Sequence, residues 1–339
     1  MKYAGSPGVL KVRDLDDAGW EELTDGVIVA AQPHGAPTRF PCNDRPSNKA
    51  TYAITMAAPS DYYVAMSGRS VETRRRGSVT EWTREMPQPM APYLATVQIG
   101  RYEARDPAND VVVIAPPDLS GDGYDASFGR QPAMMEFFES KFGPYPFDDY
   151  TVVVTDDPLE IPLESQSLST FGRNFASGEW SAVRLVAHEL SHQWFGNAVT
   201  LSDWRDIWLH EGFACYAEWL WSEESGLDSA ATRAAHFHDK LSGLDRDLLL
   251  ADPGPALMFD DRVYKRGALT LHALRLTVGD HDFFDILREW VERFGGGNAT
   301  TADFEALAAE ISGEPLGTLF DSWLRGLSLP ALPPSSSQR

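Results

Sequence analysis

Short runs of β-branched and aromatic residues occupy the first hundred positions of the chain. Clusters of Pro, Gly, Asn and Asp separate these runs, a pattern typical of strands joined by turns. The predicted strands are Val27–Ala30, Thr51–Met56, Tyr62–Met66, Ser78–Trp82 and Leu94–Ile99. We therefore expect an antiparallel β domain over residues 1–104.

From Pro132 onward the apolar residues recur at three- and four-residue spacing, which indicates helices. The predicted helices are Ala133–Phe142, Ser181–Phe195, Trp208–Glu224, Ala230–Leu241, Ala268–Val278, Phe283–Phe294 and Thr301–Ser312. One predicted strand, Tyr150–Thr155, interrupts them. The fold class is thus α+β, with a mostly helical domain over residues 105–328 and a Pro- and Ser-rich disordered tail over residues 329–339.

Composition narrows the classes of function. The 339 residues carry 29 basic and 50 acidic side chains, a formal charge of −21. Nucleic acid and anionic membrane surfaces would repel such a chain, and no apolar run approaches the roughly 18 residues of a membrane helix. The charge is explained first by solubility, although it also favours cationic ligands such as a peptide amino terminus. Two cysteines far apart form neither a disulfide framework nor a metal site, and the sequence does not indicate an oligomeric state.

Residues 186–195, VAHELSHQWF, contain an H-E-x-x-H motif in a predicted helix. Residues four apart on a helix lie one turn above each other, so His188 and His192 can direct two imidazole nitrogens at one ion. Glu189 is rotated from His188 by about 100° and can contact a water on that ion without ligating it. The motif therefore predicts metal-assisted hydrolysis with Glu189 as general base.

A catalytic zinc site needs a third protein ligand in addition to the two histidines. Glu211 follows His192 by nineteen positions and lies near the start of the next predicted helix. Glu218, seven residues further on the same face, is placed to accept the second ring N–H of a ligand histidine. We expect His188, His192 and Glu211 to bind one Zn²⁺ per chain.

Other interpretations of these residues exist. A lone H-E-x-x-H motif also occurs by chance, on a surface helix with two solvated histidines. The apolar helical context and the acid on a second helix favour the zinc site instead. Gln193 and His210 are further candidate ligands, but glutamine binds zinc poorly, and His210 is better interpreted as a neighbour of the site.

Residues 188–197, HELSHQWFGN, and residues 208–214, WLHEGFA, together resemble the aminopeptidase N family of zinc peptidases, which includes leukotriene hydrolase. The resemblance runs from about Gly26 to Leu327. It implies a thermolysin-like catalytic domain after the β domain, which is shorter here than is usual in the family.

The resemblance also implies a residue that binds the substrate's amino group. In the family a G-x-M-E-N sequence before the zinc helix supplies a glutamate for the free α-ammonium. Ile161–Ser165 is the matching segment, in which Glu164 aligns with that glutamate although the family's Gly, Met and Asn are replaced. Glu160 is the competing candidate, and both could be loop acids after a strand.

Three further segments match the family. Residues 262–268, RVYKRGA, resemble a Y-x-K-G-A segment, which implies that Tyr264 donates a hydrogen bond to the oxyanion and that Arg266 replaces a lysine. Core packing is the alternative role of Tyr264. Residues 40–50, FPCNDRPSNKA, resemble a mainly structural signature. Gln32 matches a family glutamine that reaches into the first specificity pocket.

The function implied by the resemblance is that of a zinc aminopeptidase, which hydrolyses the N-terminal peptide bond through a zinc-activated water. Its partners would be peptides with a free amino terminus. Three alternatives stay open: an epoxide hydrolase on the same zinc, a thermolysin-type endopeptidase, and a catalytically impaired binding module or fragment on the same scaffold. The preferred N-terminal residue and the physiological substrate do not follow from the sequence.

The start of the chain bears on its location. Residues 1–8 have no apolar core of a secretory signal, which favours a cytoplasmic protein. Because the β domain is short for the family, we also expect the chain to begin inside that domain. An upstream signal, and hence secretion, therefore stays open as an alternative.

Overall fold

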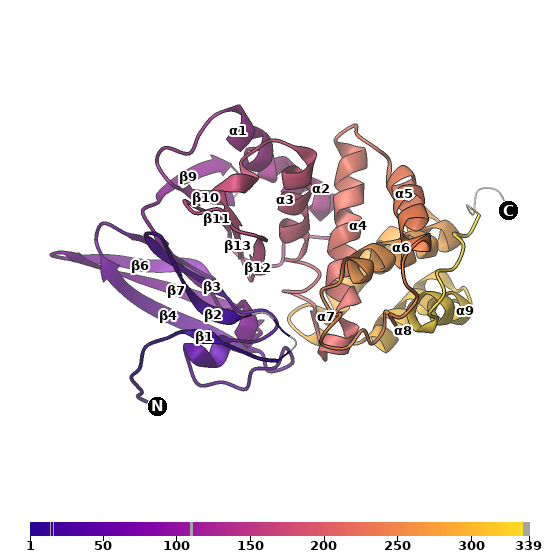
Figure 1. The fold of residues 1–339 in the computed structure, drawn as a ribbon, viewed down its shortest axis with the longest axis horizontal. Helices are drawn as coiled ribbons and strands as arrows, with labels where there is room; N and C mark the ends of the chain where they lie inside the picture. Colours follow the sequence, from indigo (N-terminus) through magenta and orange to yellow (C-terminus); the bar gives the residue numbers. More distant parts are fainter. Residues whose placement is uncertain (14, 16, 109–110, 335–339) are drawn as a thin grey trace. The chain divides into compact units, whose positions relative to one another are not determined.

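The computed structural model describes residues 1–13, 15, 17–108 and 111–334 (Figure 1). The chain divides into two compact units, residues 1–132 with 147–189, and residues 133–146 with those from 190 onward. Two of the three dividing points fall within helices α2 (Gln131–Phe142) and α3 (Trp180–Ser191), and the third falls in the loop after α2. The domain boundaries predicted at residues 104 and 328 stay a prediction, and residues 335–339 of the predicted tail lie outside the described part.

Two antiparallel sheets make up the N-terminal part of the first unit. Their strand orders are β1-β2-β3-β8-β5 and β4-β7-β6. The elements are β1 (Val9–Leu10), β2 (Ala18–Leu23), β3 (Gly26–Ala30), η1 (Ala36–Thr38), β4 (Ala50–Pro59), β5 (Tyr63–Met66), β6 (Arg69–Arg76), β7 (Val79–Met90), η2 (Pro92–Leu94) and β8 (Val97–Gly100). Val29, Val64 and Met66 of the first sheet share a core with Ala58 of the second, so each sheet buries one face.

The predicted antiparallel β domain is confirmed, but strands β1, β2 and β6 were not predicted and the ends of other strands differ. The strand predicted at Leu94–Ile99 begins only at Val97, because Pro92–Leu94 form a 3₁₀ turn for which proline presets φ. β7 continues past the predicted Trp82 to Met90. Its two prolines lie near a shift of register with β4, where the loss of an N–H donor is tolerated.

A mixed five-stranded sheet of order β12-β13-β11-β10-β9 completes the first unit. Its strands are β9 (Glu103–Ala108), β10 (Val111–Ala115), β11 (Tyr150–Thr155), β12 (Leu163–Ser165) and β13 (Leu168–Gly172), accompanied by helix α1 (Asp122–Phe128) and the 3₁₀ turn η3 (Arg173–Phe175). β11 runs parallel to both β10 and β13 and is fully buried, as expected of a parallel strand covered on two faces. Only β11 was predicted from the sequence.

The second unit is mostly helical, which confirms the predicted catalytic architecture. Its elements after α2 are β14 (Thr200–Leu201), η4 (Trp204–Asp206), α4 (Trp208–Glu224), α5 (Ala230–Ser242), α6 (Asp261–Val278), α7 (Asp280–Phe294), β15 (Asn298–Ala299), α8 (Thr301–Ser312), α9 (Gly317–Phe320) and the π-helical turn η5 (Asp321–Arg325). All residues of α4 except the last two are buried, so it is the central helix of this unit.

Helix α6 begins earlier than its apolar pattern indicates. It starts at Asp261, seven residues before the predicted Ala268. The carboxylate of Asp260 accepts a hydrogen bond from the N–H of Arg262 at 2.9 Å and thereby caps the helix. Tyr264 therefore lies in the first turn of α6 and not in a loop.

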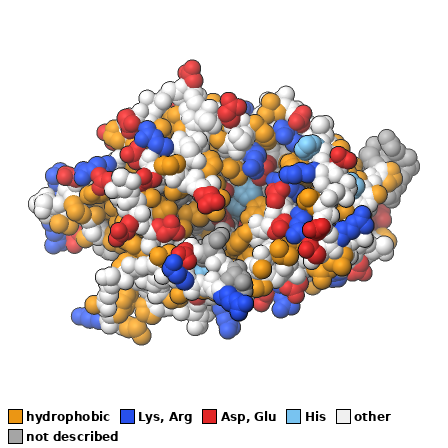
Figure 2. Space-filling view, viewed as in Figure 1, with side chains coloured by type: hydrophobic (Ala, Val, Ile, Leu, Met, Phe, Trp, Pro, Cys, Tyr) orange, Lys and Arg blue, Asp and Glu red, His pale blue; other side chains and the backbone are white. Residues whose placement is uncertain are grey.

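On the face drawn in Figure 2, acidic and basic side chains are interspersed. Within residues 1–108 and 111–334, leaving aside 14 and 16, no helix is long and apolar enough to cross a membrane.

Candidate metal centre

The H-E-x-x-H motif spans the end of helix α3. The helix ends at Ser191, four residues before the predicted end at Phe195. Beyond it the chain continues in a tighter turn, in which the N–H of Trp194 donates to the carbonyl of Ser191 at 3.1 Å. Gly196, at φ 136°, a conformation that favours glycine, then ends the helical path. His192 lies in this turn and not in the helix.

The side chain of His192 is oriented through both ring nitrogens. Its Nδ1 lies 3.0 Å from the carbonyl oxygen of Phe195. Because a carbonyl only accepts, Nδ1 is the donor in this contact, and Nε2 is the ring nitrogen left to face a metal. Nε2 lies 3.5 Å from Oε2 of Glu211.

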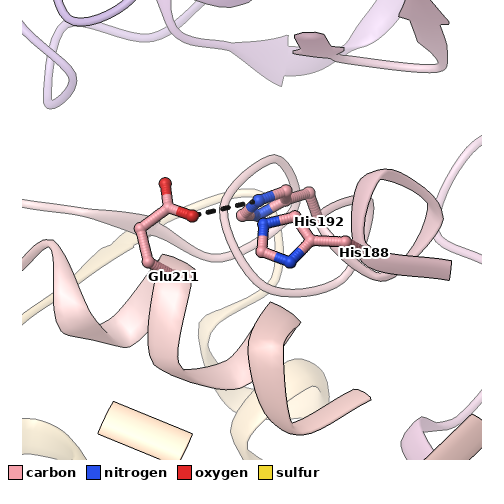
Figure 3. Close-up of side chains that lie close together, drawn as sticks. All are labelled: His188, His192 and Glu211. Atoms are coloured by element: carbon pink, nitrogen blue, oxygen red, sulfur yellow. Dashed lines mark ion pairs between the residues drawn. The ribbon is translucent and has the colours of Figure 1, made fainter. Parts of the chain in front are cut away.

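His188, His192 and Glu211 bring two imidazole nitrogens and one carboxylate oxygen together. One such atom from each residue lies within 4.8 Å of the other two. Figure 3 shows the carboxylate of Glu211 facing the histidine rings. All three side chains are buried, at 4%, 1% and 3% exposure, where a carboxylate needs a compensating positive charge. This buried N,N,O donor set fits a catalytic zinc ion.

The first turn of α4, which carries Glu211, is fixed by two hydrogen bonds. Nε1 of Trp208 donates to Oγ1 of Thr301 at 2.8 Å, and the N–H of Leu201 donates to Nε2 of His210 at 2.9 Å. His210, an alternative ligand from the sequence, is thereby committed to the backbone of β14.

A second carboxylate lies beside the predicted general base. Glu164 stands on the edge strand β12, opposite Ser169 of β13. It is 9% exposed, and one of its carboxylate oxygens lies within 4.8 Å of a carboxylate oxygen of Glu189. Glu160, the competing candidate, is exposed in a bend before β12. The structure therefore places Glu164 beside Glu189, whereas Glu160 is exposed to solvent.

Tyr150 is a buried group near Glu189 that the sequence did not single out. Its hydroxyl donates to Oγ of Ser169 at 2.7 Å. Burial, and to a smaller extent the negative charge of Glu189, raise the pKa of Tyr150, against an opposing effect of the Ser169 contact. The phenol is therefore uncharged at neutral pH.

The remaining predicted site residues lie on separate elements. Tyr264 is half-buried on α6, Glu218 is buried on α4 two turns after Glu211, and Gln32 is half-buried in the loop after β3. The Nε2 atom of Gln32 is buried and has no hydrogen-bond partner among the described residues. The roles assigned to these three side chains stay predictions.

Arg266, at the position of a family lysine, binds main-chain carbonyls. Its Nε donates to the carbonyl of Trp323 at 2.9 Å, and Nη2 donates to that of Gly326. Burial lowers the pKa of Arg266 to about 10, so the group is still charged at neutral pH. Arg266 thus ties the segment after α9 to the helix that carries Tyr264.

Two close backbone relationships near the site were not predicted. A Cβ added to Gly212 would lie 2.7 Å from the Cα of Gly267, so helices α4 and α6 touch there. Ser167, at φ 58°, is the one non-glycine residue with positive φ in the described ranges, and its Oγ accepts the N–H of Gly68 at 2.9 Å. The sequence offered one signal of the helix contact, namely Gly212 inside the predicted helix Trp208–Glu224, because a glycine within a helix usually allows close packing.

The fold and the site together define a class, that of H-E-x-x-H metallohydrolases whose third ligand is a glutamate on a second helix. Two family models match the chain: the peptidase family M1 domain over residues 126–323 and the peptidase M1 N-terminal domain over residues 24–94. The chain belongs to peptidase family M1, a family of zinc metallopeptidases. The resemblance to aminopeptidase N-like enzymes is therefore confirmed.

Individual relatives agree with this assignment. Aminopeptidase M1-A of Oryza sativa subsp. japonica is 28% identical over 335 residues, which is 92% of this chain but 38% of the rice enzyme. The crystal structure of an M1 zinc metallopeptidase from Deinococcus radiodurans is 32% identical, with a TM-score of 0.86 over 98% of this chain and 76% of that one. Yeast LTA4 hydrolase, at 22% identity and a TM-score of 0.77 over 92% of this chain and 52% of that one, shares the fold.

Proposed function

We propose that the chain is a zinc-dependent aminopeptidase, which binds one zinc ion and removes the N-terminal residue from peptides. The observation that carries this proposal is the buried carboxylate of Glu164 beside Glu189. A second negative group next to a general base suits a substrate that brings a positive charge there, as the α-ammonium of a peptide does. An endopeptidase has no such requirement.

The separation of the two carboxylates matches an exopeptidase. In a peptide the α-nitrogen and the first carbonyl carbon are joined through one Cα, so they lie about 2.5 Å apart. An ammonium on Glu164 and a carbonyl attacked beside Glu189 can therefore belong to the same residue, since the carboxylate oxygens lie within 4.8 Å. Only the first peptide bond of a substrate would then reach the base.

Each of the predicted site residues has one role in the proposed reaction. When bound, zinc supplies a Lewis acid that polarises the scissile carbonyl and lowers the pKa of a bound water towards ~7. Glu189 accepts the proton of that water and passes it to the leaving amine. Tyr264 donates a hydrogen bond to the developing oxyanion, Glu164 holds the α-ammonium, and Gln32 offers its amide to the first side chain.

The crystal structure of one relative supports a peptide substrate. A variant of the Deinococcus radiodurans M1 enzyme, 32% identical to this chain with a TM-score of 0.88 over 97% of this chain and 76% of that one, was crystallised with a Tyr-Ser-Ala substrate. The likeness to yeast LTA4 hydrolase concerns the fold and lends no support to an epoxide hydrolase. A binding module is disfavoured because the ligand set and the base are all present.

The test is a zinc measurement and a peptidase assay on the same purified sample. We expect close to one zinc per chain, and release of the first residue from aminoacyl fluorogenic substrates that chelators abolish and an N-acetyl cap blocks. Equal cleavage of capped and free substrates would point to an endopeptidase. Bound zinc without cleavage would point to a binding module, and a folded protein without zinc would contradict the proposal.

A further inference from the structure

Helices α4 and α6 cross at two glycines whose backbones are in contact. A Cβ built on Gly267 would lie 2.6 Å from the Cα of Gly212, and one built on Gly212 would lie 2.7 Å from the Cα of Gly267. Carbon atoms in ordinary contact are ~3.5–4 Å apart, so a methyl group at either position fits only if the helices separate by roughly 1 Å. The main chain itself therefore sets the distance between these helices.

The crossing lies next to two residues of the proposed chemistry. Gly212 directly follows Glu211 on α4, and Gly267 stands three residues after Tyr264 on α6. Residues three apart on a helix share a face and are about 4.5 Å apart along the axis. Any displacement at Gly267 is therefore carried to Tyr264 by one rigid helical turn.

Both helices are held at their starts. The start of α4 is buried and held by the hydrogen bond from Trp208 to Thr301 at 2.8 Å. The start of α6 is capped by Asp260, which accepts a hydrogen bond from the N–H of Arg262 at 2.9 Å. An added methyl group at the crossing would push the two helices apart and so change the distance between Tyr264 and Glu211.

We infer that the contact between Gly212 and Gly267 is a positioning device that sets the place of the Tyr264 phenol relative to Glu211. The inference rests on the proposed function, in which Tyr264 meets the oxyanion. A displacement of about 1 Å in such a group can lower the rate on the order of 100-fold. Alanine is also a better helix former than glycine, so a loss of activity at Gly267→Ala would run against the local helix propensity.

The experiment combines Gly267→Ala with Tyr264→Phe, singly and together. The readouts are kcat and KM, the zinc content, and the Kd of an amino-acid hydroxamate, which presents an oxyanion to the same site. We expect Gly267→Ala to lower kcat roughly 10- to 100-fold with zinc retained and KM nearly unchanged. In the Tyr264→Phe background the same substitution should change kcat and the hydroxamate Kd by less than about 3-fold, because no hydroxyl is left to misplace.

Two further variants separate this role from a structural one. Gly243→Ala is the matched control, because the nearest atom to its added Cβ is 3.8 Å away, and its kcat should equal that of the parent. Gly212→Ala places the methyl group on the other helix of the same contact. It should show the same dependence on Tyr264, and it replaces Gly267→Ala if that protein does not fold.

The outcomes are distinct. The inference would be overturned if Gly267→Ala lowered kcat by the same factor in the parent and in Tyr264→Phe. It would also be overturned if folded, zinc-loaded Gly267→Ala kept the kcat of the parent. A parent protein that cleaves nothing would contradict the proposed function instead. The hydroxamate affinities of the four proteins would still measure the coupling in that case.

Discussion

Nδ1 of His192 lies 3.0 Å from the carbonyl oxygen of Phe195, which belongs to the turn after the helix and not to the H-E-x-x-H motif. The next residue, Gly196, closes this turn at φ 136°. A Cβ added to Gly196 would stand 3.3 Å from Nδ1 of His192. The orientation of a metal ligand therefore depends on a glycine outside the motif.

Gly196→Ala should weaken zinc binding. The substitution strains a left-handed φ and crowds the His192 ring, and loss of a contact that orients a ligand histidine typically lowers metal affinity about 10- to 100-fold. Competition with a chromophoric chelator measures this. Gly226→Ala is the matched control, with φ 74° and open space around its Cβ, and should lose stability but keep its zinc affinity. Equal zinc affinities in both variants would refute the prediction.

Glu189→Gln should keep zinc and lose turnover. The amide retains the shape of the side chain but cannot accept the proton of the water, and a general base typically contributes on the order of 10²- to 10⁴-fold. Metal analysis together with kcat on an aminoacyl substrate checks both halves. Activity within a few-fold of the parent would remove Glu189 from the role of base.

Glu164→Gln should reduce kcat/KM for free peptides roughly 10- to 100-fold, the value of one hydrogen bond to a charged group. Peptides with an acetylated amino terminus carry no ammonium, so their slow cleavage should change little and the preference for free peptides should shrink. Glu160→Gln is the control, because Glu160 is exposed in a bend. If Glu160→Gln reproduced the loss, the assignment of Glu164 would be wrong.

Arg266→Met should destabilise the second unit. Arg266 is 6% exposed, and its guanidinium donates to carbonyls of the segment after α9, including that of Trp323 at 2.9 Å. Its removal leaves buried carbonyl groups without a donor, a loss of about 3 kcal/mol in the free energy of unfolding. Urea unfolding measures it. Arg293→Met removes an exposed arginine paired with Glu289 and Glu310, and should change little.

His272 should make the folded state sensitive to acid. Burial and then the positive charge of Arg275 lower its pKa to about 4, with Asp280 opposing, while the Tyr216 hydroxyl lies 3.1 Å from its Nδ1. An unfolded histidine titrates near ~6.5, so between pH 6.5 and 4 the unfolded chain binds more protons than the folded one. The free energy of unfolding therefore decreases by roughly 3 kcal/mol as the pH is lowered through this range.

The measurement for His272 is urea unfolding of the parent and of His272→Gln at pH 7 and pH 4.5. Glutamine does not titrate, so the stability of the parent relative to the variant should fall on acidification. Release of zinc at low pH acts on both proteins alike and drops out of the difference. A difference that is the same at both pH values would contradict the buried, neutral histidine.

The local spacing of apolar residues was sufficient to predict most helices of the second unit. The predicted ends lie within three residues of the observed ones for helices α4, α5, α7 and α8, because the apolar residues of these helices recur with the helical period. The pairing of His188 with His192 is equally local. Glu211 required a chemical argument, since a zinc site needs a third ligand and the spacing allowed a second helix to supply it.

Long-range pairing accounts for what the sequence did not show. Strands β10, β12 and β13 have five residues or fewer, and β13 is set by its pairing with β11, so their apolar runs carry no clear period. The end of α3 was placed too late because the turn that follows it keeps helical spacing. The contact of Gly212 with Gly267 joins two helices far apart in the sequence, and only the folded backbone reveals it.

The two-residue turn Gln166–Ser167 holds β12 against β13 in a register that sets Glu164 opposite Ser169. Alternate residues of a strand point to opposite faces, so a slip by one position would present Leu163 or Ser165 in place of Glu164. Both are uncharged, so under the proposed function the free end of a peptide would no longer be distinguished from its interior. An insertion or deletion of one residue in this turn would then be a short evolutionary route from trimming peptide ends to cutting within chains.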